Sequence, residues 1–197
     1  MTANTIGELH PSLVTAKTRP LFAMRLSARM TPIGATPGCV RRVSAITGGF
    51  FEGERLSGDV LDGGNDWQTI RSDGAITLDV RIALKTRDDA LITMAYRGLR
   101  HGPPEVLARL DRGEVVEPTE YYFRVCGTFE TASPKYDWLN RLFAVGSGHR
   151  LPDGPIYSIF ELLGRSSVRD QDLIAIWSET KTGMGARKRW RTHGGSG

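Results

Sequence analysis

Two predicted strands each carry a polar side chain and an arginine on the same face, because successive strand residues point to opposite sides of a sheet. These faces hold Asp79 and Arg81 on the first strand and Tyr122 and Arg124 on the second. Burial and a nearby arginine can tune the basicity of a carboxylate, and guanidinium and phenol groups can hold a developing anion. If these faces line a cavity, we expect Asp79, Tyr122 and Arg124 to be catalytic and Arg81 to bind the substrate. The alternative is a ladder of salt bridges or a solvated face.

A second candidate lies in the segment GGNDWQTIR, where two glycines precede Asp66 and Trp67. Asp66, at a turn that enters a strand, could act as an acid or base, and Trp67 could form one wall of a pocket. The alternative is structural: Asp66 caps the turn through its own backbone, and Trp67 fills the core. We retain Asp66 as a catalytic candidate and Trp67 as a substrate-binding one.

Three further side chains are candidates for contact with a substrate. Tyr96 and Trp138 could join Trp67 as apolar walls, and Asn140 could offer its amide to a ligand carbonyl. The segment YDWLNRLF also has the pattern of a short amphipathic plug over one end of a core. We favour the plug for its apolar members and leave both roles open for Asn140.

The chain from Leu21 onward consists of short apolar segments separated by turn signals such as DGGND and SDG. The segments have strand lengths, and Gly, Asp and Asn stand where tight turns need them. The clearest strand is 77–85 and the last is 156–163, whereas 104–112 predicts a helix and 135–143 a short helical turn. No alternation of strands with long helices is visible. The sequence therefore predicts an all-β fold, an antiparallel β-barrel of about eight to nine strands with one or two short helices.

Charge separates the predicted barrel from its ends. We expect an N-terminal arm at residues 1–20, a barrel domain at 21–163 and a basic extension at 164–197 that ends in a linker-like GGSG. The extension holds seven basic and three acidic side chains, which account for the net charge of +4. Residues 1–163 are then neutral, so nucleic acid is an unlikely partner.

Several other functional classes lack their signals. There is no run of roughly 20 apolar residues for a membrane helix and no secretory signal, and with two cysteines we expect a cytoplasmic protein. No histidine or cysteine spacing fits a zinc site, and no glycine-rich phosphate or dinucleotide motif joins a strand to a helix. We therefore expect no metal and no cofactor.

The motifs GGNDWQ, YYFR, FET and WLNRLF follow one another in this order. With them the chain resembles domain-of-unknown-function family 3237, also called uncharacterised protein family 0311, over about residues 21–163. The resemblance implies an antiparallel β-barrel, often assembled as an oligomer. It further implies isomerase or lyase chemistry on small aromatic or polyketide-like molecules.

The polar strand faces and the resemblance together favour a cofactor-free enzyme. We expect isomerase, cyclase or lyase chemistry on a compact aromatic or enone-like compound in the barrel cavity. One alternative is a non-catalytic barrel that binds a lipophilic molecule or an aromatic carboxylate, and another is an oligomeric scaffold. We also expect a homo-oligomer, because an outward apolar strand face would need cover.

Overall fold

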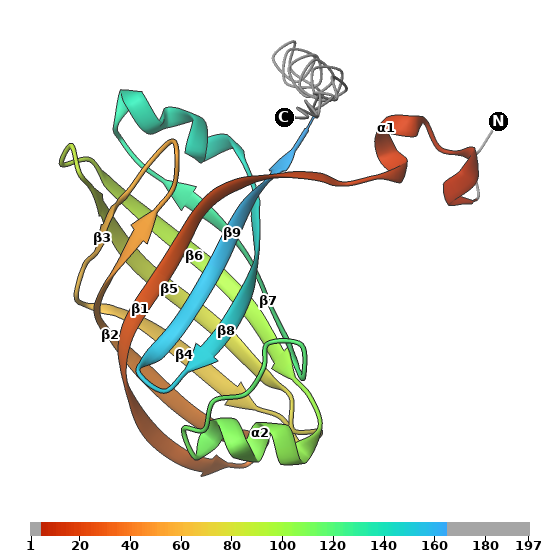
Figure 1. Ribbon diagram of the computed structural model, residues 1–197, viewed down its shortest axis with the longest axis vertical. Coiled ribbons are helices and arrows are strands. Elements are labelled where there is room, and N and C mark those ends of the chain that lie inside the picture. Colours follow the sequence, from red (N-terminus) through yellow and green to blue (C-terminus); the bar gives the residue numbers. More distant parts are fainter. Residues whose placement is uncertain (1–4, 165–197) are drawn as a thin grey trace, which may run out of the picture. The chain divides into compact units, whose positions relative to one another are not determined.

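The computed structural model describes residues 5–164, which are dominated by one antiparallel sheet of nine strands (Figure 1). The strands are β1 (Lys17–Thr36), β2 (Cys39–Glu52), β3 (Gly58–Val60), β4 (Gly64–Ile70), β5 (Ile76–Thr86), β6 (Leu91–His101), β7 (Tyr122–Glu130), β8 (Ala144–Leu151) and β9 (Gly154–Leu163). The helical elements are η1 (Ile6–Glu8), α1 (Pro11–Val14), α2 (Pro104–Asp111) and η2 (Pro134–Arg141).

The sheet closes on itself. The ring runs through β1, β2, β4, β5, β6, β7, β8 and β9 and returns to β1, and short β3 also pairs with both β2 and β5. Closure gives each of the ring strands two hydrogen-bonded neighbours, which is how barrels avoid exposed sheet edges. The predicted antiparallel barrel with short helices is confirmed.

Side-chain alternation decides what the barrel encloses. On β5, Leu78, Val80 and Ile82 point inward and are at most 6 % exposed, whereas Asp79 and Arg81 point outward. The barrel itself thus covers the apolar strand faces. They do not need a partner subunit, which removes the reason given for a homo-oligomer; the oligomer itself stays a prediction.

A β-bulge bends the long β1–β2 hairpin. Ser27 pairs with Gly48 and Ala28 with Ile46, so Thr47 is an extra residue on β2, and such insertions bend a strand and increase its twist. Beyond the bulge the hairpin continues to the end of the barrel where α2 lies (Figure 1). The hairpin and α2 together frame that end.

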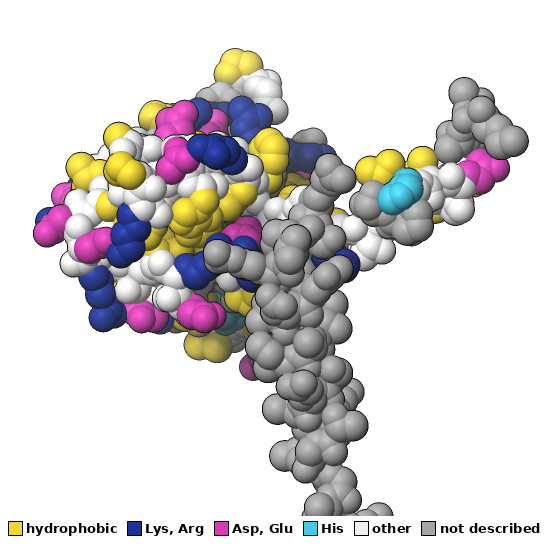
Figure 2. Space-filling model, turned by 90° about the horizontal axis from the view of Figure 1, so that it is seen from above, with side chains coloured by type: hydrophobic (Ala, Val, Ile, Leu, Met, Phe, Trp, Pro, Cys, Tyr) yellow, Lys and Arg dark blue, Asp and Glu magenta, His cyan; other side chains and the backbone are white. Residues whose placement is uncertain are grey.

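The opposite end is filled by side chains. Tyr136 and Leu139 of η2 are buried in the core, with Trp138 and Leu142 packed against it, as the amphipathic pattern indicated. Figure 2 looks onto this end and shows hydrophobic side chains in its middle with charged side chains around them. The 3₁₀ helix thus acts as a plug.

A buried carboxylate ties the strands together at the plugged end. Glu161 is 4 % exposed, and its two oxygens accept hydrogen bonds from Arg19, at 2.7 Å, and from Arg55. The Arg55 guanidinium also lies 4.2 Å from the centre of the Trp138 ring. Both oxygens of this buried charge therefore have partners, as burial of a charge requires.

The ends of the barrel domain differ slightly from expectation. β1 begins at Lys17, inside the segment 1–20 that we expected to be an arm. The predicted extension at 164–197 lies outside the described residues except for Gly164. Within the described part of the chain, no helix is long and apolar enough to cross a bilayer.

Glu161→Gln should lower the free energy of unfolding by about 2 kcal/mol, because it removes the charge that joins two arginines. The cost stays below the ~3–5 kcal/mol of a fully buried pair because both arginines are partly exposed and can turn to water. Urea unfolding measures this. The control is Glu52→Gln, whose ion pair with Arg87 is exposed on both sides; equal effects of the two changes would contradict the structural role of Glu161.

Candidate functional site

A cavity of about 160 Å³ remains inside the barrel at the α2 end. It opens between the β1–β2 hairpin, α2 and the β8–β9 turn, and its apolar walls include Leu26, Leu78, Leu110 and Phe123. An engineered cavity of about 150 Å³ in another protein binds benzene. The space inside this barrel is therefore large enough for about one ring.

Asp66 is a buried carboxylate on the wall of this cavity. It lies on β4 between Ser44 and Val80 of the neighbouring strands and is 6 % exposed. Gln68 donates a hydrogen bond from Nε2 to Oδ2 at 2.5 Å, whereas Oδ1 has no hydrogen-bond partner among the described residues. Burial raises the pKa of Asp66 from 3.8 to about 6; the hydrogen bond from Gln68, the charges of Arg100 and Arg42, and the nearby backbone N–H of Asp79, which lies outside hydrogen-bond geometry, act in the opposite direction.

The orientation of Gln68 follows from its other neighbour. Arg42 donates from Nε to Gln68 Oε1 at 2.6 Å, and because arginine has only donors, the amide NH₂ group must face Asp66. Arg42 in turn lies 3.5 Å from Asp111 at the end of α2. A chain of contacts thus leads from α2 through β2 to the buried carboxylate.

Arg100 closes the inward-facing row of β6 and is also only 6 % exposed. Its guanidinium forms no hydrogen bond or ion pair with any described residue; its carbon atom lies 5.8 Å from the centre of the Phe123 ring. Burial lowers the pKa of Arg100, and the positive charge of Arg42 adds to this effect. The cavity wall therefore holds a cation that the described chain does not pair.

Two phenols complete the wall. The rings of Tyr96 and Tyr157 meet edge to face at 5.7 Å, and burial raises the pKa of both, so both stay protonated near neutral pH. Tyr157 also contributes to the raised pKa of Tyr96. The Tyr96 hydroxyl nevertheless has no hydrogen-bond partner among the described residues. Gly127 makes room for Tyr96, because a Cβ there would lie 2.6 Å from the Tyr96 Cβ.

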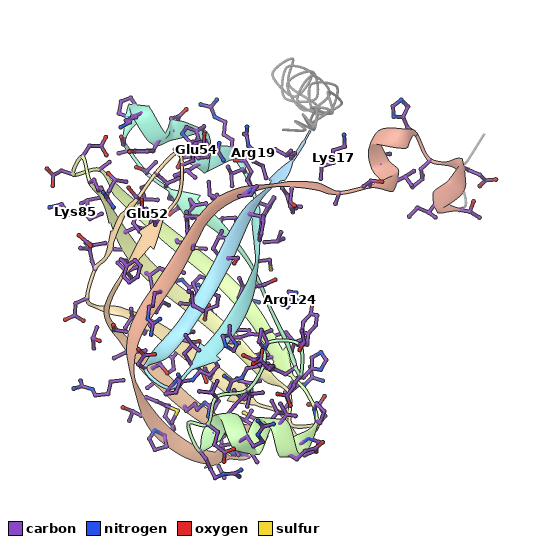
Figure 3. The ribbon with its side chains drawn as sticks, viewed as in Figure 1. Lys17, Arg19, Glu52, Glu54, Lys85 and Arg124 are labelled. Carbon is purple, nitrogen blue, oxygen red and sulfur yellow. The ribbon has the colours of Figure 1, made fainter. Side chains whose placement is uncertain are left out.

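The structure places two of the residues predicted from sequence at this cavity, Asp66 and Tyr96. Five others lie on the outer face of the barrel: Asp79, Arg81, Tyr122, Arg124 and Trp67. Figure 3 shows Arg124 on the outside of the wall. The expectation that the polar face lines the interior is corrected, because the strands bury their apolar face there instead.

The outer residues form surface contacts. Arg81 donates to Asp79 at 3.2 Å in an exposed ion pair, as in the ladder alternative. The Arg124 guanidinium lies 5.1 Å from the centre of the Tyr122 ring, and both side chains line an open depression of the outer surface. Trp67 is 44 % exposed and does not fill the core.

Trp138 and Asn140 lie on η2 at the plugged end, away from the cavity. The Asn140 amide accepts from the Thr131 N–H at 2.8 Å and donates to the Thr131 carbonyl at 3.0 Å. It fixes the loop between β7 and η2, so its polar atoms are already engaged. The predicted contacts of these two residues with a ligand at the cavity are therefore not formed by this fold.

Several cavity residues were not predicted from the sequence, namely Arg42, Gln68, Arg100, Arg150 and Tyr157. A signal existed for one of them: Arg100 continues the two-residue spacing of Ile92, Met94 and Tyr96, which places a charge on an apolar face.

Within residues 5–164 no group of three or more His, Cys, Asp or Glu side chains could hold a metal ion.

Asp66→Asn should stabilise the protein near neutral pH. The raised pKa means that the folded state keeps a proton that the unfolded chain loses as the pH rises from about 4 to 6, so ionised Asp66 costs stability above that range. At about 1.4 kcal/mol per pKa unit, the cost approaches about 3 kcal/mol. The difference in unfolding free energy between variant and parent should grow from near zero at pH 4 to this value at pH 7; a difference independent of pH would contradict the burial argument.

The fold is similar to that of several proteins of known structure. The crystal structure of a conserved protein of unknown function from Rhodopseudomonas palustris has a TM-score of 0.73 at 37 % identity, and covers 76 % of this chain and 99 % of its own. A β-barrel like protein from Acinetobacter baumannii has a TM-score of 0.66 at 41 % identity, with coverages of 76 % and 97 %. An enzyme from Penicillium herquei, at 22 % identity and a TM-score of 0.58 over 75 % of this chain and 95 % of its own, shows likeness of fold alone.

Sequence comparison points the same way. A UPF0311 protein of Rhodopseudomonas palustris is 38 % identical over 152 residues, which are 76 % of this chain and 98 % of the relative. Another, from Clostridium acetobutylicum, is 37 % identical over 62 % of this chain and 77 % of the relative. The model of the family described as protein of unknown function (DUF3237) matches residues 16–162, so the chain belongs to this family.

Proposed function

We propose that the protein is a cofactor-free enzyme that carries out acid–base chemistry on a compact aromatic or enone-like compound in the barrel cavity. The observation that carries the proposal is Asp66, a buried carboxylate on a cavity of ring size, one of whose oxygens has no hydrogen-bond partner among the described residues. Its pKa of about 6 suits a general base, because a base works best when its pKa is near the working pH.

Asp66 Oδ1 would accept a proton from a carbon next to a carbonyl group or from a hydroxyl group of the substrate. The electron pair left behind moves onto the carbonyl oxygen as an enolate, or stays on oxygen as a phenolate. Return of the proton to another carbon completes an isomerisation. For ring closure, the oxygen attacks the β-carbon of the enone in the same molecule, the displaced electron pair moves onto the enone carbonyl, and protonated Asp66 returns its proton to the resulting enolate. For a lyase step, the enolate expels a leaving group with its electron pair, and protonated Asp66 returns its proton to that group. Each path conserves atoms and needs no oxidant or reductant.

Tyr96 and Tyr157 would stabilise the developing negative charge. Both phenols are protonated near neutral pH because burial raises the pKa of each, so both can donate a hydrogen bond to an oxyanion. Fixed donors in a buried site act strongly on a charge that develops during the reaction. Leu78 and Phe123 would hold the apolar part of the substrate.

Two observations support catalysis over the other candidate functions. A cavity that opens at the α2 end is present, which a purely structural barrel would not need. The orienting contact from Gln68 leaves one carboxylate oxygen available, which a binding barrel would not need. The Penicillium herquei enzyme supports only the point that a barrel of similar fold can belong to an enzyme.

Incubation of catalytic amounts of protein with aromatic enones, phenols and lactones, read by mass spectrometry, should show conversion far beyond one equivalent. Asp66→Asn should reduce turnover by about 100-fold or more, since a positioned base contributes about 10²–10⁴-fold. The matched control is Asp79→Asn on the outer face of the neighbouring strand, which should leave turnover unchanged. Loss of turnover in the control alone would move the reaction to the outer surface, and one equivalent of unchanged compound would indicate a binding barrel.

Gln68→Met should shift the pH dependence of kcat/KM. The methionine cannot donate the hydrogen bond that lowers the pKa of Asp66, so the acidic limb of the profile, near pH 6 in the parent, should move to higher pH. Trp67→Phe, on the outer face of the same strand, should leave the limb in place. An unchanged limb in Gln68→Met would assign the pH dependence to a group other than Asp66.

A further inference from the structure

Arg100 is a buried arginine that forms no hydrogen bond or ion pair with another described residue. Arg100 is only 6 % exposed. Its guanidinium nevertheless has no hydrogen-bond or ion-pair partner among the described residues. Burial of an unpaired charge is costly, and native proteins pair such groups as a rule. An anionic ligand in the cavity would supply the partner that the described chain does not provide.

The other charged side chains at the cavity are already engaged or lie near its mouth. Asp111 forms an ion pair with Arg42 and is exposed. Asp153 is also exposed and accepts a hydrogen bond from Arg25 of β1. Arg150 donates to the backbone of Leu151. Asp66, on the same cavity wall, forms no ion pair with Arg100 and receives its hydrogen bond from Gln68. Arg100 is thus a cavity cation with neither a hydrogen-bond nor an ion-pair partner among the described residues.

The surroundings of Arg100 select for an organic anion. Leu78 and Phe123 border the same cavity, and the Phe123 ring lies beside the guanidinium. Gly148 is what allows this ring position, because a Cβ there would lie 2.6 Å from the Phe123 ring. A hydrated inorganic ion would gain nothing from these apolar walls, whereas a ring bearing a carboxylate matches both the walls and the charge.

We propose that the substrate is a ring-sized organic carboxylate, and that Arg100, near the α2 end of β6, binds its carboxylate group. The planar guanidinium presents parallel N–H donors that match the two oxygens of a carboxylate. With the carboxylate held there, the remainder of the ring lies within the same cavity as Asp66. This inference rests on the proposed function and names the substrate class for it.

The test is binding of two matched probes, benzoate and benzamide, by isothermal titration at pH 7. They share a ring and differ in charge. The parent protein should bind benzoate about tenfold or more tightly than benzamide, the range expected for a hydrogen bond to a charged group. Arg100→Met should remove this preference, whereas Arg100→Lys, which keeps the charge and loses the planar fork, should retain part of it.

Arg97→Met is the control, because Arg97 lies on the outer face of the same strand and should leave the preference unchanged. Equal binding of the two probes by the parent, no binding of either, or an unchanged preference in Arg100→Met would overturn the proposal. Asp66→Asn separates it from the proposed reaction: this variant should keep the preference for benzoate while losing turnover. A preserved preference with unchanged turnover would leave the carboxylate site standing and remove Asp66 as the base.

Discussion

Closure of the sheet is the constraint on which the other features depend. Once eight strands form a ring, every second side chain of each must fit inside a space of fixed width. Large apolar residues fill most of it, and glycines such as Gly127 allow the aromatic rings to enter. The space that these residues leave unfilled becomes a cavity. Closure of the ring also buries every polar side chain that stands at an inward-facing position.

The two ends of the barrel treat buried charge in opposite ways. At the plugged end, Glu161 has an arginine on each oxygen, and the adjacent Trp138 packs over Arg55. At the α2 end, Asp66 keeps one free oxygen and Arg100 has no partner among the described residues. Buried polar groups in native proteins usually have hydrogen-bond partners, and the exceptions tend to lie at functional sites. Glu161 follows this rule at the plugged end, whereas Asp66 and Arg100 depart from it at the α2 end.

Unsatisfied polar groups have a stability cost that the fold must offset elsewhere. The contact chain from Asp111 through Arg42 and Gln68 holds Asp66 in one orientation. The apolar side chains that β5 and β6 bury are a source of stability. Preorganised groups of this kind are what a reaction in a small cavity requires, because they need not rearrange as charge develops. Stability and the proposed chemistry thus place opposite demands on the same side chains.

The sequence by itself determined the strands, the helix at α2, the plug at η2 and the antiparallel barrel, because alternation, turn residues and helix-end signals are local. It also pointed to Asp66 and Tyr96. It could not say which face of β5 or β7 turns inward, and the choice of the polar face put Asp79 and Tyr122 inside when they lie outside. Only the tertiary structure brought Asp66, Gln68 and Arg100 together, because strands distant in sequence meet only when the ring closes, and burial depends on that closure.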